Sequence, residues 1–175
     1  MITIRGTRAN GCYVLIVALA IAIALGVPAS ASQPEPLTHR SVPIEAICSG
    51  ISDLQPGKLL LDSVQFSWSF DSDCQVVTLE HGVEVATVHA QGTGEGNCLN
   101  SIGEGSWELV FKDGQVVQGE LSWTHGLSAL AFSGTHDAGG MGTLTGGGQA
   151  TPRDPGACVG DGADEFEVDF VAELS

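Results

Sequence analysis

Positive charge is scarce in this 175-residue chain. Lysine and arginine number 6 together, against 21 aspartates and glutamates. After residue 31 all 21 acidic residues remain but only four basic ones, so the formal charge of that part is 4 minus 21, or −17. The four are Arg40, Lys58, Lys112 and Arg153. Such a field repels phosphate backbones and anionic lipid headgroups. We therefore expect neither nucleic acid nor an anionic membrane surface as a partner.

Helical patterning is also missing. No segment shows sustained helical periodicity between capping residues. Two segments instead alternate strictly, 64–70 and 165–174. Strict alternation predicts half-buried strands. The residues expected to face inward are Val64, Phe66, Trp68 and Phe70 in the first, and Phe166, Val168, Phe170, Ala172 and Leu174 in the second.

The stretch WELVFKDGQVVQGELSW, residues 107–123, predicts a β-hairpin around Asp113-Gly114. A two-residue loop would mix apolar and polar side chains on one face. A three-residue loop pairs Phe111 with Gln115 and puts the apolar side chains on one face. A one-residue slip exchanges the faces, so we predict the three-residue loop, with Gly114 in the left-handed conformation.

Weaker strand patterns occupy 75–79, 83–90, 127–132 and 141–145, and the segment 127–132 is expected to be a buried strand. Between them lie glycine-rich pieces that we interpret as turns and bulges. The prediction is an all-β fold, either an antiparallel β-sandwich or a small β-barrel of about seven to nine strands.

The amino terminus has the pattern of a secretory signal peptide. Arg5 and Arg8 precede an apolar run of about 16 residues, shorter than a spanning helix needs, and small residues follow at 29–31. We predict a signal peptide at 1–31, a flexible proline-rich lead-in at 32–43, and a single β domain at 44–175. The expected localisation is secreted or extracytoplasmic, in the cell envelope or the medium.

Four cysteines follow the predicted cleavage site: Cys48, Cys74, Cys98 and Cys158. An even number in a secreted chain predicts disulfides. None of them forms the closely spaced pair typical of a zinc site. Three pairings are possible, and we favour Cys74–Cys98 with Cys48–Cys158.

A resemblance rests on three stretches in order: GEGNC, then FKDGQVVQGELSWT, then FSGTHDAGGMGTLTGGGQATPRDPGAC. Over roughly Cys48 to Ser175 the chain resembles a group of small secreted actinobacterial proteins, β-rich with two disulfides. That group has no assigned activity. The resemblance therefore implies secretion and β structure and transfers no catalytic residue.

Catalytic patterns are weak. The chain has no Gly-x-Ser-x-Gly elbow. Ser133, His136 and Asp137 are neighbours in sequence, which seldom gives a catalytic triad because a triad is assembled in space. With 21 acidic side chains, some carboxylate pair at a glycosidase-like separation is nearly inevitable and carries no information.

Metal patterns are equally weak. His81, His89, His125 and His136 lie in different segments without zinc spacing. The acidic stretches 71–73 and 160–165 do not match the twelve-residue calcium loop. We expect no catalytic residue, cofactor or resident metal.

Trp68, Trp107 and Trp123 lie on predicted inward faces, where they either fill the core or line a ligand cavity. The expected function is therefore a non-enzymatic secreted module, structural or binding an apolar small molecule, a cell-envelope component or a protein. The alternative is a small secreted hydrolase that uses loop carboxylates. An enclosed cavity or a large exposed apolar patch would favour the binder.

Overall fold

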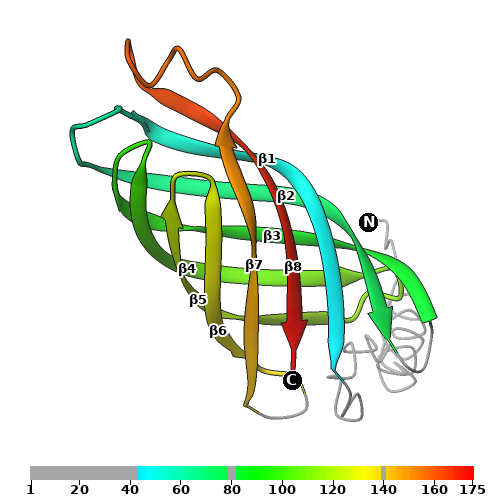
Figure 1. The fold of residues 1–175 in the computed structure, drawn as a ribbon. Coiled ribbons are helices and arrows are strands. Elements are labelled where there is room, and N and C mark those ends of the chain that lie inside the picture. The colour runs from blue at the N-terminus through cyan, green and yellow to red at the C-terminus, as the bar shows by residue number, and fades with distance from the viewer. Residues whose placement is uncertain (1–42, 79–81, 139–140) are drawn as a thin grey trace, which may run out of the picture. The chain divides into compact units, whose positions relative to one another are not determined.

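The computed structural model describes residues 43–78, 82–138 and 141–175. Eight antiparallel strands form one closed barrel in sequence order (Figure 1). This confirms the all-β prediction and its strand number, and selects the barrel over the sandwich. The strands are β1 (Ile44–Lys58), β2 (Val64–Thr78), β3 (Gly82–Gly96), β4 (Asn100–Phe111), β5 (Val116–Gly126), β6 (Ala129–His136), β7 (Gly142–Pro152) and β8 (Ala163–Leu174).

The last strand closes the barrel against the first. Ile44 pairs with Leu174, and the register continues without interruption to Asp53 opposite Glu165. On its other side β8 pairs with β7. Every strand therefore has two hydrogen-bonded neighbours, which removes the free edges through which sheets associate. The acidic outer face of β8 is thus not the face of an edge strand.

The hairpin β4–β5 has the predicted register. Leu109 pairs with Val117, and the Phe111 amide donates to the Gln115 carbonyl at 2.9 Å. Gly114 has a φ of +83°, as the three-residue loop requires. Trp107, Leu109, Phe111 and Val117 are all buried on the inward face. The apolar side chains therefore selected the register correctly.

Other strand assignments are corrected. The segment 64–70 and the described part of 75–79, which ends at Thr78, belong to one continuous strand, β2, because the acidic residues between them face outward without interrupting the ladder. The glycine-rich stretches at 92–96 and 145–149 lie within β3 and β7 and are not turns. The predicted buried strand near 127–132 is β6, whose residues alternate between half-buried and exposed.

Three glycines within the strands face inward opposite an aromatic side chain. The directly paired residues are Phe66 with Gly94, Trp123 with Gly103, and Phe132 with Gly146. A Cβ atom at Gly94 would come within 2.7 Å of the Phe66 ring. Each ring therefore lies over the glycine opposite it. The ring covers the part of the backbone that glycine, having no side chain, leaves exposed.

All four predicted disulfide cysteines are bonded, but the favoured pairing is wrong. Cys48 bonds Cys74, and Cys98 bonds Cys158. Cys48 and Cys74 lie directly opposite each other on β1 and β2, with Cα atoms 4.4 Å apart, inside the bridging range. Cys98 lies in the β3–β4 connection, which the β7–β8 connection meets at one end of the barrel.

The predicted signal peptide (1–31) and lead-in (32–43, all but residue 43) lie outside the described residues. Within the described ranges the chain forms no apolar helix of membrane-spanning length. Two disulfides are consistent with folding in an oxidising, extracytoplasmic compartment.

Replacing Gly114 should weaken the hairpin. We expect Gly114→Ala to lower the free energy of unfolding by about 1 kcal/mol, because alanine is strained at this positive φ. Gly160→Ala is the matched control, since its Cβ would meet only one atom, at 3.9 Å, and its φ is not positive. Urea unfolding followed by tryptophan fluorescence measures both, and equal stabilities would contradict the assigned turn.

The disulfide pairing makes a second prediction. Peptide mapping under non-reducing conditions should recover Cys48 linked to Cys74 and Cys98 linked to Cys158. The double substitution Cys98→Ala, Cys158→Ala should cost about 2 to 4 kcal/mol of stability, because it releases the restraint that the bond places on the unfolded chain. A peptide joining Cys74 to Cys98 would refute this pairing.

Candidate functional site: an apolar cavity with a buried lysine

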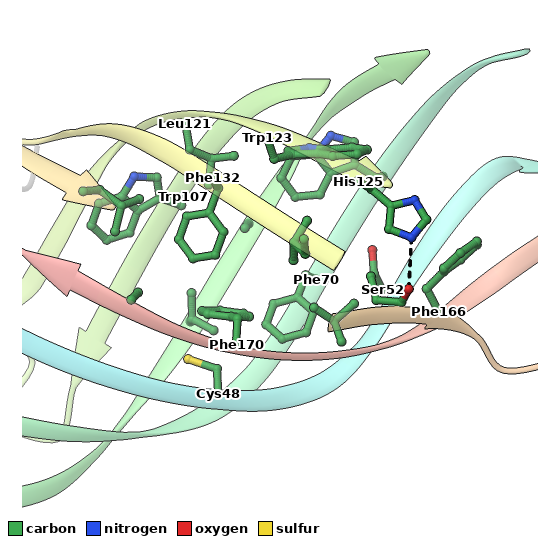
Figure 2. Close-up of a pocket in the computed structure, with 18 of the residues that line it drawn as sticks. Cys48, Ser52, Phe70, Trp107, Leu121, Trp123, His125, Phe132, Phe166 and Phe170 are labelled. Carbon is green, nitrogen blue, oxygen red and sulfur yellow. Dashed lines mark hydrogen bonds between the residues drawn. The ribbon is translucent and has the colours of Figure 1, made fainter. Parts of the chain in front are cut away.

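The interior of the barrel contains a cavity of about 130 Å³ lined by inward-facing side chains (Figure 2). Its wall contains all three tryptophans of the chain and five of its six phenylalanines. Among the described residues, no aspartate or glutamate lines it. The aromatic lining residues are Phe66, Trp68, Phe70, Trp107, Trp123, Phe132, Phe166 and Phe170.

Six of these eight rings form two packed groups. In one, Trp123 contacts Phe66 and Trp68, with ring centroids 6.2 and 6.0 Å apart. In the other, Phe170 contacts Phe70 at 5.5 Å and Phe132 at 5.2 Å. Edge-to-face and tilted contacts at these separations are the preferred aromatic geometries. The rings therefore form a firm apolar wall contributed by β2, β5, β6 and β8.

One end of the cavity is polar. Its polar side chains there are Lys58, His125 and Ser52, and Figure 2 shows His125 and Ser52 beside Phe166, at the end away from Trp107. Lys58 reaches this place through an irregularity in β1. The pairing with β8 shifts between Asp53 and Lys58, so that Lys58 comes to lie opposite Ala163 with its side chain in the core.

A chain of hydrogen bonds crosses this end. The Lys58 ammonium donates to the Ser101 hydroxyl oxygen at 3.1 Å, and that oxygen lies 3.5 Å from Nδ1 of His125. Nε2 of His125 lies 3.0 Å from the Ala150 carbonyl oxygen. A carbonyl only accepts, so Nε2 carries the proton and Nδ1 accepts from Ser101. Ser101 and His125 meet because they are directly paired on β4 and β5.

Lys58 is a buried cation with no anionic partner among the described residues. Its side chain is 3% exposed, and no carboxylate oxygen of the described residues lies within 4.0 Å of its nitrogen. Burial lowers the pKa of Lys58 from 10.5 to about 8. The ammonium lies 4.1 Å from the Phe166 ring centroid and 5.4 Å from that of Phe66. These aromatic faces offset part of the lost hydration.

His125 is neutral at ordinary pH. Burial lowers the pKa of its imidazole, and the positive charge of Lys58 lowers it further. The ring therefore acts as a hydrogen-bonding link between Ser101 and the backbone of β7, not as a second buried cation.

Ser133, His136 and Asp137, the neighbours in sequence that were not expected to form a triad, are not brought together. Ser133 is exposed on the outer face of β6, whereas His136 is buried. Both ring nitrogens of His136 have backbone partners, the Ala138 amide and the Ser175 carbonyl. Asp137 accepts from the Gln118 amide. These contacts hold the end of β6 and the residue that follows it.

The acidic stretches also have structural partners. Asp71 contacts His89 across β2 and β3, and Asp73 accepts from the Thr87 hydroxyl at 2.9 Å, so residues 71–73 are strand and not loop. Glu165 pairs with Arg153 at 2.8 Å. Within the part of the chain that the structure describes, no three histidine, cysteine or acidic residues gather as a metal site. His81 lies outside that part.

Sequence reasoning placed the three tryptophans on the inward face correctly but missed Lys58. The only local sign is its position after Pro56-Gly57 and before three leucines, one of the few charged residues in an apolar stretch. Comparison with protein-family models, with curated proteins and with solved structures gave no match. The argument for function therefore rests on the geometry of the cavity.

The free energy of unfolding should depend on pH because of the buried charge of Lys58. At pH 7 Lys58 is protonated in both states, and its burial destabilises the fold. Between pH 8 and 10.5 the folded protein has lost this proton while the unfolded chain still binds it, so stability rises over this window, by about 3 kcal/mol.

We expect Lys58→Met to be more stable than the wild type at pH 7, by about 1 to 3 kcal/mol, because it removes the buried charge and keeps the volume. The gap should shrink towards pH 10.5. Urea unfolding of both proteins at pH 7 and pH 10 measures it, and a gap that does not change with pH would contradict this assignment.

Proposed function

We propose that the protein is a secreted, non-enzymatic barrel that binds a small apolar molecule in its interior. The observation that carries the proposal is the interior cavity of about 130 Å³ with an almost wholly aromatic and aliphatic wall. Small-molecule sites are concave, mostly apolar and equipped with a few placed polar groups. Lys58 and His125 supply such groups here.

The size of the cavity limits the ligand. An apolar engineered cavity of about 150 Å³ in another protein stays dry and accepts benzene. A cavity of about 130 Å³ therefore suits a molecule with a single ring or a short branched chain. A protein with a buried apolar cavity of this kind loses packing contacts that a ligand would restore.

Secretion belongs to the same proposal. It is supported by the basic and apolar amino-terminal pattern, by the two disulfides, and by the resemblance to small secreted actinobacterial proteins. The alternative, a hydrolase that uses loop carboxylates, has less support. Among the described residues no carboxylate lines the interior cavity, and the acidic side chains discussed above contact partners on the outer surface.

Benzene is a direct probe of this proposal. Because all three tryptophans line the cavity, occupancy should change the intrinsic tryptophan emission. It should also raise the Tm, since a ligand that binds only the folded state stabilises it by mass action. If saturating benzene altered neither the emission nor the Tm, the result would argue against an accessible binding cavity.

A matched pair of variants locates the site. Ala90 lines the cavity between Phe70 and Trp107 on the neighbouring strands, so Ala90→Leu should fill it and abolish the benzene response. Ala131→Leu makes the same change on the exposed face of β6 and should leave the response intact. Equal responses in the two variants would place benzene elsewhere.

A further inference from the structure

The buried cation specifies more than an apolar ligand. We propose that the cavity takes a small monocarboxylate, whose acidic group binds the Lys58 ammonium while its apolar body lies among the aromatic rings. This inference rests on the proposed function, because it assigns a ligand class to the same cavity. It starts from an imbalance: the cavity wall holds one positive charge and no negative one among the described residues.

The Lys58 ammonium also lacks oxygen acceptors for some of its N–H donors among the described residues. An ammonium has three N–H donors. One of them meets the Ser101 oxygen, while the two nearby rings, Phe66 and Phe166, offer only aromatic faces. A carboxylate placed at this end would supply oxygen acceptors for the remaining donors. It would also pair a charge whose isolated burial is costly.

The single charge and its surroundings favour a monoanion. Pairing with one lysine neutralises one negative charge, and His125 is held neutral by burial and by Lys58 itself. A phosphate dianion would leave an unpaired charge in an apolar cavity, which is strongly unfavourable. A cationic ligand would face direct repulsion from the ammonium. The acidic exterior of the protein further disfavours multiply charged anions.

The walls define the body of the ligand. The same cavity that contains Lys58 is lined by rings from both aromatic groups, so an apolar body attached to the acid would contact Trp123 and Phe70 or Phe170. The volume of about 130 Å³ suits a body of one ring or a short branched chain. The chemical class is therefore a compact aromatic or branched aliphatic acid.

Three probes of similar size separate the contributions at pH 7. Benzoate carries the charge, benzamide is its neutral analogue, and benzene has neither group. Isothermal titration calorimetry on the wild-type protein should show benzoate binding about 10- to 100-fold more tightly than benzamide, because a charge-assisted hydrogen bond replaces a neutral one. This comparison does not depend on any variant.

Two lysine variants test the anchor. Lys58→Met should remove the preference for benzoate and keep the binding of benzene. Lys112→Met, which changes the exposed lysine of the β4–β5 loop, should leave all three affinities unchanged. The inference is overturned if benzoate binds no better than benzamide, or if the preference for benzoate survives Lys58→Met. In either case, binding of benzene would still support the proposed function. Binding of none of the three probes refutes both.

Discussion

The hydrogen bonds between β1 and β8 close the sheet, and the interior exists as a separate environment because of them. In an open sheet the same inward-facing side chains would share one face with water. Closure instead brings Phe70 of β2 against Phe170 of β8, on the two strands that flank β1. The aromatic wall, the cavity and the buried lysine are all consequences of a sheet whose first and last strands meet.

Burial of Lys58 destabilises the fold, whereas burial of the aromatic side chains around it stabilises the fold. Dry aromatic packing favours an interior with no charge, yet the irregularity in β1 directs an ammonium into it. Ser101 and the ring of Phe166 only partly replace the water that this group loses. An unpaired buried charge is among the costlier features a small domain carries, and such features concentrate at functional sites. The lysine is therefore better explained by ligand binding than by stability.

Much of the fold could be predicted from the sequence, because alternation and turn chemistry are local. Local sequence was enough to predict three elements: the strands at 64–70 and 165–174 and the turn at Gly114. The disulfide pairing could not be predicted, because it depends on Cys48 lying opposite Cys74, and thus on the register of a strand with an irregular pattern. The polar end of the cavity was hidden for the same reason: Lys58 meets its partners only when three-dimensional closure brings five strands together.

The glycines of the barrel wall have a consequence for selectivity. A Cβ atom at Gly103 would come within 2.5 Å of the Trp123 ring, and one at Gly94 within 2.7 Å of the Phe66 ring. Each ring therefore occupies a position that only a bare backbone allows. Exchange of such a glycine for alanine would displace a ring and reshape the lumen, while the backbone ladder kept its partners. A single exchange of glycine for alanine would thus change the shape of the interior between related barrels and leave their topology the same.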